Sequence, residues 1–492
     1  MRRMSFLGLL FLGSIAACTP VTAKVFLRVE PSPLPPADKT GIQDVVLLWP
    51  LRDLSVAGKL LSQGYRVFLQ CESKDLAAAV VTADRALVTG IIVADTAPSS
   101  HSAAAEQLRP YFAAHKNLTF RMLVPGGKQP QMKARLVVER DGVLQVSSPS
   151  SQPWLDTNLA LVRLAQSGHP DSLPIIYDFH WDTPGLLPDA WHPDAEAYAL
   201  AIAEADAIHS DVTIDLPGSL QRALVADDPR AWTLWKAVMP YLDFSSHAPT
   251  ERMLPVGNLG VIVDEAHTSY EAINLMARHN LAFEAVGPSG LTVARLSSWN
   301  SVVVFCFLPK EAVALLRDFA ASGGIVVFVN AHDEFPWHSA PPLRQDSRAT
   351  VYSIGSGQVV ELTGPVVDPE NFARDLRRLI GRERSALALW NSLSTLVTGY
   401  HEQSRADVTL YLVNYAAQPD NVQVQVKGRF TRVRLESPEE SCCVSLPFVE
   451  RGSFTEFTIP ALHITARVHL DSARETSAAR QKERMIDLQT AR

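Results

Sequence analysis

The 492-residue chain is 47% hydrophobic and 20% charged, a composition typical of globular proteins and unlike that of disordered chains. A single hydrophobic core does not extend over such a length, so we expect about three domains. With a net charge of −7 and a pI near 6.1, the chain has no basic footprint for nucleic acid, and we expect a small neutral partner.

The first residues have the pattern of an export signal. Two arginines precede an apolar stretch, residues 5–17, that is too short to span a bilayer. Ile15-Ala-Ala-Cys18 resembles a bacterial lipobox with Cys18 lipidated, whereas Val21-Thr-Ala23 suits ordinary signal peptidase; Cys18 as a plain apolar residue of the signal is a third interpretation. We expect residues 1–23 to be the signal and the protein to be an exported, membrane-anchored lipoprotein, periplasmic or on the cell surface, with simple secretion as the alternative.

The other four cysteines are too sparse for a disulfide framework. Cys71 and Cys306 lie in apolar, strand-like runs, and we expect both to be buried as small hydrophobic residues. Cys442 and Cys443 would point to opposite faces of a strand, so we expect no ordinary bridge between them.

Residues 24–250 alternate apolar runs with helix-like segments, a pattern that predicts parallel β/α units. The expected strands are 25–29, 44–48, 66–70, 90–94, 118–124, the run from Ile175, and 211–214. The expected helices are 51–63, 75–87, 103–115, 158–166, 194–208 and two pieces within 219–242. Residues 134–139 and 143–147 predict an inserted hairpin around Asp141-Gly142.

This pattern predicts a small (β/α) barrel of the TIM type, with an open doubly wound sheet as the alternative. The barrel is preferred because four carboxylates each lie at the end of an apolar run and would meet at one mouth. These carboxylates are Glu72, Asp95, Asp178 and Asp215.

The stretch 173–182 concentrates the most functional groups, because an apolar run leads directly into Asp178, His180, Trp181 and Asp182. A capped turn is the structural alternative for these residues. Trp181 and Trp191 flank a proline-rich loop, where indole rings suit the apolar face of a sugar but equally pack beneath a loop. The His-x-Asp spacing is too weak to predict a metal, and we predict no cofactor.

Residues 255–382 predict a five-stranded, flavodoxin-like α/β domain. The expected strands are 259–264, 282–286, 301–307, 325–330 and 359–362, and the expected helices are 270–279, 310–321 and 369–380. Gly355-Ser-Gly357 predicts a hairpin turn rather than a phosphate loop, since no lysine and helix follow. Residues 264–267 and 330–334 end two strands at the edge where such sheets bind ligands, although helix capping explains Asp264 nearly as well.

Residues 386–471 lose helical periodicity and predict an antiparallel β-sandwich. Its expected strands are 408–413, 422–426, 431–435, 454–459 and 464–470. The polar residues 472–492 are expected to be a mobile tail.

Three stretches carry a family resemblance. Residues 272–284 (AINLMARHNLAFE) join a helix to a strand, residues 316–328 (LRDFAASGGIVVF) end a helix at a glycine pair before a buried strand, and residues 457–469 (FTIPALHITARVH) are similar to closing sandwich strands. In this domain order the chain resembles bacterial β-galactosidase-type glycoside hydrolases, whose middle domain is similar to class I glutamine amidotransferases and serves in trimerisation. Over the barrel the resemblance is architectural. It implies a carbohydrate ligand and an assembly of identical chains.

Two departures from the family pattern matter for chemistry. Cys306 lies in Val304-Phe-Cys-Phe-Leu308 without a Gly-x-Cys-x-Gly turn, so amidotransfer is not supported. The paired glutamates that the resemblance implies after the fourth and seventh strands have no clear match, and the fourth strand instead leads into Val124-Pro-Gly126.

Glycoside hydrolysis needs two carboxyl groups about 5–10 Å apart. We expect Asp178 and Asp215 to be the first pair and Glu72 and Asp95 the reserve, with His180, Trp181, Asp182 and Trp191 contacting the sugar. The hypothesis is an exported glycoside hydrolase-like protein that acts on a glycan by carboxylate acid/base chemistry. The alternative is a non-catalytic carbohydrate-binding or assembly lipoprotein with a degenerate barrel.

Overall fold

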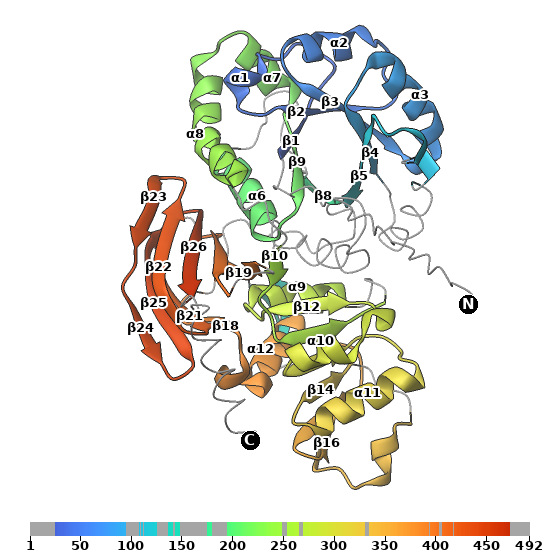
Figure 1. Cartoon of the computed structure of the whole chain (residues 1–492), viewed down its shortest axis with the longest axis vertical. Helices are drawn as coiled ribbons and strands as arrows, with labels where there is room; N and C mark the ends of the chain where they lie inside the picture. Colours follow the sequence, from blue (N-terminus) through green and yellow to red (C-terminus); the bar gives the residue numbers. More distant parts are fainter. Residues whose placement is uncertain are drawn as a thin grey trace, which may run out of the picture.

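The chain folds into three units, which Figure 1 shows as a barrel above an α/β domain and a β-sandwich. A computed structural model describes residues 25–94, 108, 110–111, 113–124, 136–140, 143–147, 175–179, 194–247, 253–264, 269–329, 334–392, 394–402, 406–416 and 418–472. The predicted fold class, an α/β multidomain protein with a terminal sandwich, is confirmed. The signal segment with Cys18 and the tail beyond residue 472 lie outside the described residues.

Seven parallel strands close the first unit into a barrel. They are β1 (Val25–Arg28), β2 (Asp44–Leu48), β3 (Arg66–Glu72), β4 (Gly90–Ala94), β5 (Thr119–Val124), β8 (Ile175–Phe179) and β9 (Asp211–Asp215). The barrel closes because β9 pairs with β1, from Val25 opposite Val212 to Arg28 opposite Asp215. This pairing rules out the open sheet. The expected inserted hairpin is also present, as β6 (Leu136–Arg140) and β7 (Val143–Ser147).

Side chains alternate between the barrel interior and the surrounding helices. One apolar residue from each of five strands fills the interior, and these residues are Phe26, Val46, Phe68, Ile92 and Leu123. The alternate residues join a larger core beneath the helices. That outer layer includes α1 (Ala37–Thr40), α2 (Ser55–Ser62), α3 (Leu76–Ala86), α6 (Ala195–Ala207), α7 (Gly218–Val225) and α8 (Pro229–Ser246).

Helix α6 is buried on all sides, which is unusual for a helix of a β/α barrel. It packs against α8 and β9 of the barrel and against a strand of the sandwich. The alanine-rich sequence from Ala195 to Ala207 permits this close approach on every face. Helix α6 is therefore the structural link between the barrel and the sandwich.

The second unit has the strand order β12-β11-β13-β14-β17, which is the flavodoxin-like order 2-1-3-4-5. Its parallel strands are β11 (Leu259–Ile262), β12 (Phe283–Val286), β13 (Ser301–Val304), β14 (Ile325–Phe328) and β17 (Gly357–Leu362). The helices are α9 (Tyr270–Arg278), α10 (Val293–Ser298), α11 (Lys310–Ala321) and α12 (Pro369–Ile380). Two antiparallel strands that we did not predict, β16 (Ala349–Ile354) and β15 (Arg344–Gln345), extend the sheet. The predicted hairpin turn at Gly355 joins β16 to β17, with φ at +59°.

The third unit is a sandwich of two antiparallel sheets around one apolar core. One sheet contains β10 (Met253–Pro255), β19 (Thr395–Glu402), β20 (Val408–Asn414), β26 (Thr465–Ser472), β22 (Phe430–Ser437) and β23 (Glu440–Ser445). The other contains β18 (Leu387–Leu389), β21 (Asp420–Lys427), β25 (Phe454–Leu462) and β24 (Phe448–Arg451). Strand β10 comes from the segment before the second unit, so the chain enters the sandwich twice.

Buried polar contacts fix the sandwich against the barrel. Arg467 on β26 pairs with Asp206 on α6 at 2.8 Å, and both side chains are at most 3% exposed. The same guanidinium donates to the carbonyl of Phe244 at the end of α8. Tyr415 donates its hydroxyl to the buried Glu204 of α6 at 2.8 Å. Because every one of these groups is withdrawn from water, the two units are held in one arrangement.

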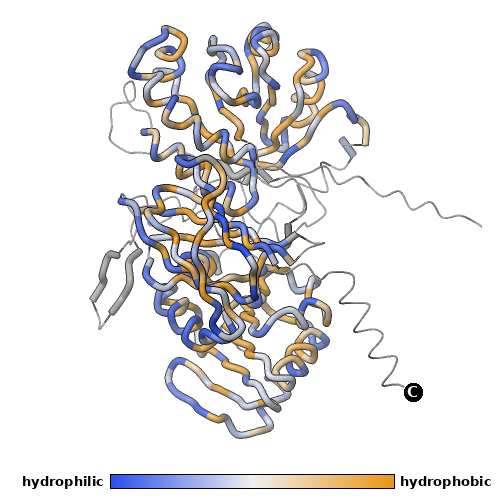
Figure 2. The backbone as a smooth tube through the Cα atoms, turned by 60° about the vertical axis from the view of Figure 1, so that its left-hand side comes forward, coloured by the Kyte–Doolittle hydropathy of each residue, from blue (hydrophilic) through white to orange (hydrophobic). Residues whose placement is uncertain are grey.

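Apolar and hydrophilic segments alternate along the chain in all three units, as Figure 2 shows. Within the described residues, no helix combines the length and apolar character that a membrane span needs.

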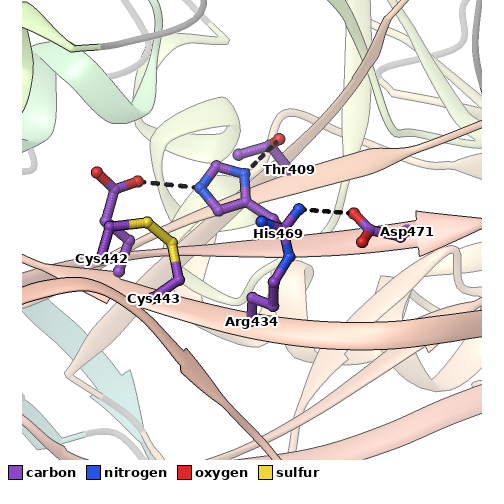
Figure 3. The surroundings of a disulfide bond; sticks show 7 residues. Thr409, Arg434, Cys442, Cys443, His469 and Asp471 are labelled. Carbon is purple, nitrogen blue, oxygen red and sulfur yellow. Dashed lines mark hydrogen bonds and ion pairs between the residues drawn. A yellow bond between two sulfur atoms is a disulfide. The ribbon is translucent and has the colours of Figure 1, made fainter.

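The structure corrects one expectation about the cysteines. Cys442 and Cys443 form a vicinal disulfide on β23, beside His469 and Arg434 (Figure 3). Our expectation assumed a trans peptide, across which neighbouring side chains point apart. The peptide bond between the two cysteines is cis, and their Cα atoms are 3.1 Å apart. As expected, Cys71 is buried; Cys306, which we also expected to be buried, is half-buried.

Candidate functional site

The mouth of the barrel contains a polar group centred on Arg28. The Arg28 side chain is 7% exposed and donates from Nη1 to Oδ1 of Asp215 at 2.8 Å. Its Nε donates to Oε1 of Gln70 at 3.1 Å. Arg28 and Asp215 lie opposite each other in the register of β1 and β9, so their side chains leave the same face of the sheet. The guanidinium thus joins β1, β3 and β9 just inside the mouth.

A second ion pair fills the barrel below this group. Arg121 on β5 pairs with Asp211 on β9, and both side chains are buried. Its guanidinium also lies over the Phe26 ring, 5.5 Å from the centroid. Strand β8 lies between β5 and β9, so this ion pair joins two strands that are not hydrogen-bonded to each other. The barrel interior is therefore a packed core and not a pore, so it has no room for a ligand below the mouth.

The backbone around Asp215 is held by buried groups. The Tyr198 hydroxyl on α6 donates to the Asp215 carbonyl at 2.9 Å. Burial raises the pKa of the Tyr198 phenol, and the charge of Asp215 adds to this effect, so the phenol stays a neutral donor. On α7, which follows β9, the fully buried Gln221 donates to the carbonyls of Ser32 and Pro33 and fixes the segment after β1. Two of the loops at the mouth are consequently rigid.

The structure places three of the predicted carboxylates on barrel strands. Asp215 ends β9 beside Arg28. Glu72 ends β3 at the rim, where its half-exposed side chain pairs with Lys74 at 2.6 Å. Asp178 is on β8, opposite Thr213 in the register, and its side chain lies outside the described part of the structure.

The positions of Asp178 and Asp215 are close together, because β8 and β9 are neighbouring strands. One strand spacing and two residues of rise place their Cα atoms about 8 Å apart. Asp178 and Asp215 are therefore candidate residues on adjacent strands of one side of the barrel.

The remaining predicted site residues lie outside the described residues and stay predictions. They are Asp95, His180, Trp181, Asp182, Trp191 and the lipidation site Cys18. The sequence reasoning missed Arg28, Gln70 and Arg121. The available signal was a charged or amide residue at an inward position of an apolar strand, as in Val25-Phe-Leu-Arg28.

No group of three or more potential metal ligands occurs among the described residues. In the second unit, burial raises the pKa of the Cys306 thiol to about 12, and nearby Asp264 adds to the effect. The thiol therefore stays protonated near neutral pH and is a poor nucleophile. This fits the missing nucleophile turn in the sequence around Cys306.

The fold defines a multidomain protein made of a (β/α) barrel, a flavodoxin-like α/β domain and an antiparallel β-sandwich. No family model matches the chain, and no curated protein matches its sequence. Its structure resembles the α-L-fucosidase isoenzyme 2 from Paenibacillus thiaminolyticus, with a TM-score of 0.56, 12% identity, and coverage of 92% of this chain and 100% of that one. It also resembles a β-galactosidase from Rahnella sp. R3, with a TM-score of 0.52, 9% identity, and coverage of 88% and 94%. The resemblance expected from the sequence is confirmed for the fold.

Proposed function

We propose that this protein is a glycoside hydrolase that acts on an extracellular or periplasmic glycan at the barrel mouth. The observation that carries the proposal is the carboxylate of Asp215, fixed by Arg28 beside the strand that bears Asp178. The similar solved structures are named as a fucosidase and a galactosidase, which supports glycosides as the substrate class.

The contacts suggest separate roles for the two carboxyl groups. We assign Asp215 the role of nucleophile or base, because Arg28 holds its carboxylate in place at 2.8 Å. Asp178 would then be the acid that protonates the leaving oxygen, with Glu72 and Asp95 as the reserve. His180, Trp181, Asp182 and Trp191 would contact the sugar from the loop after β8.

Sugar release from a panel of fucosides, galactosides and plant or bacterial oligosaccharides tests the proposal. Loss of an acid or base typically lowers kcat by about 10²- to 10⁴-fold, so Asp178→Asn and Asp215→Asn should each reduce release to that extent. Glu311→Gln, which changes an exposed carboxylate on α11, is the matched control and should retain wild-type activity. Full activity in both aspartate variants would show that Asp178 and Asp215 are not the catalytic pair.

A second candidate is a carbohydrate-binding or assembly lipoprotein without catalysis. It is favoured by the engagement of Asp215 with Arg28, since a carboxylate already bonded in the core can be purely structural. This candidate would be supported if calorimetry shows that the wild-type protein binds oligosaccharides while no sugar is released.

We further propose that Cys18 anchors the protein in a membrane. Burial of acyl chains contributes about 0.8 kcal/mol per methylene, so two or more chains make release negligible. Wild-type protein should stay with membranes after a high-salt wash, whereas Cys18→Ser should yield an uncleaved precursor or a soluble form cut after Ala23. Wild-type protein in the soluble fraction with Lys24 at its N-terminus would indicate simple secretion instead.

A further inference from the structure

A cleft of about 260 Å³ lies on the seam between the barrel and the sandwich. Glu196 of α6 and Tyr241 of α8 line it from the barrel side. Gln418 and Pro419 line it from the loop after β20, and His463 and Ile464 from the turn before β26. The cleft thus combines functional groups from two units that are far apart in the sequence.

The walls of the cleft on the sandwich side are held by one buried amide. Asn414 is 1% exposed and donates to the carbonyls of Gln418 and Leu462, both at 3.0 Å. Its Oδ1 accepts from the backbone N–H of Ala416 at 3.0 Å. Asn414 therefore fixes both loops that face the barrel.

The barrel side is equally fixed. Asp194 caps the first turn of α6 by accepting from the N–H of Ala197 at 2.8 Å. The Tyr241 hydroxyl donates to Glu439, on the turn between β22 and β23, at 2.9 Å. Together with the buried contact between Tyr415 and Glu204, these bonds preform the cleft, so a ligand would find it already open.

The chemistry of the lining suits a neutral sugar. A carboxylate, a phenol, an amide and an imidazole offer both acceptors and donors, which is what hydroxyl groups require. Pro419 and Ile464 add an apolar surface for the carbon face of a pyranose ring. The described lining contains no lysine or arginine, so the cleft does not select for an anion.

The position of the cleft connects it to the mouth of the barrel. Helix α6 runs opposite to β9, and its first turn lies at the mouth end. Tyr198 on that turn faces β9 and contacts the Asp215 carbonyl at 2.9 Å, whereas Glu196 on the same turn projects from the other side of the helix and lines the cleft. The cleft and the mouth are thus separated by the first turn of α6. A glycan chain that leaves the mouth over the start of α6 would meet the cleft.

We infer that the cleft is a distal subsite that holds a neutral sugar unit of an oligosaccharide whose reacting end occupies the barrel mouth. The inference rests on the proposed function and narrows its substrate class to glycan chains rather than simple glycosides. Only an oligosaccharide long enough to reach from the mouth to the cleft would gain binding free energy from this subsite.

Binding by the full mature chain can be measured by titration calorimetry with neutral gluco-, galacto- and manno-oligosaccharides in a size series from monomer to hexamer. Affinity should rise with length. His463→Ala removes one hydrogen-bonding group from an exposed position and should weaken the longest ligands about fivefold, with the shortest unchanged. Ala237→Trp fills the cleft from the exposed face of α8 and should remove the length dependence. Ala78→Trp, on the exposed face of α3, is the control.

The outcomes separate this inference from the proposed function. Identical length dependence in wild type, Ala237→Trp and His463→Ala would overturn the subsite, even if sugar release persists. Length-dependent binding that the cleft variants remove, without any sugar release by the wild type, would support the subsite and overturn the hydrolase. Absence of binding to every oligosaccharide would overturn the inference.

Discussion

Replacing Asp206 by asparagine should strongly destabilise the contact between the barrel and the sandwich. The carboxylate of Asp206 is the charge partner of Arg467, at 2.8 Å, and both side chains are almost completely buried. Asparagine keeps the shape but leaves the guanidinium without its countercharge. The carbonyl of Phe244 and the rings of Phe244 and Tyr411 remain as its neighbours.

The magnitude follows from the burial of the pair. Two unit charges about 4 Å apart attract by about 4 kcal/mol at an effective dielectric constant of 20. Removal of one partner of a buried pair costs about 3–5 kcal/mol, because the other charge stays desolvated. The double variant Asp206→Leu/Arg467→Met removes both charges together and should lie close to the wild type, within about 1–2 kcal/mol.

Urea unfolding followed by far-UV circular dichroism measures these differences. Asp375→Asn is the matched control, since it breaks the exposed pair between Asp375 and Arg378 on α12, which should contribute less than about 1 kcal/mol. If Asp206→Asn lowers the unfolding free energy no more than Asp375→Asn does, the pair is hydrated and the two units are not rigidly docked.

Two smaller perturbations test packing and pH dependence. In Gly260→Ala on β11 the new methyl group would overlap the buried Trp299 ring and should cost about 1–3 kcal/mol. Gly58→Ala meets no atom within 4 Å in the middle of α2 and should instead stabilise by about 0.5–1 kcal/mol; equal midpoints of thermal unfolding in the two variants would contradict this reasoning. The hydrogen bond from His469, at 3.0 Å, lowers the pKa of Glu436 in the folded state. Its stabilising effect is therefore complete above the ordinary value of 4.5 and is lost as the pH falls through the folded value, so Glu436→Gln should flatten the acid limb of a urea-midpoint profile, and parallel profiles would argue against the bond.

The sequence alone determined most of the secondary structure, because the relevant signals are local. Helices α11 and α12 begin and end at the predicted residues. In α12 the cause is visible, since Asp368 caps the first turn, Pro369 occupies its first position and Gly381 follows its end. The seven apolar runs that became barrel strands were recognised in the same way. The edge strand β15 was not predicted because both of its residues are exposed, and β16 was not predicted because its buried residues, Ala349 and Thr350, are adjacent and do not alternate with exposed ones.

One long-range contact, the pairing of β9 with β1, distinguishes the closed barrel from the open sheet. The sequence favoured closure through the positions of its carboxylates, but nothing local states which edges will meet. The complete burial of α6 was equally invisible, because a helix shows a polar face only when one side is in water.

The tertiary structure by itself decided the chemistry of the mouth. The sequence indicated carboxylates at the ends of strands, and Asp215 lies at such a position. It did not indicate that Arg28, 187 residues away, would lie opposite Asp215 and bond to it. Ion pairs between distant residues depend on barrel closure and on strand register. Both are determined by many weak contacts distributed over the whole chain. A sequence pattern therefore locates candidate groups along the chain, and only the closed fold decides which of them touch.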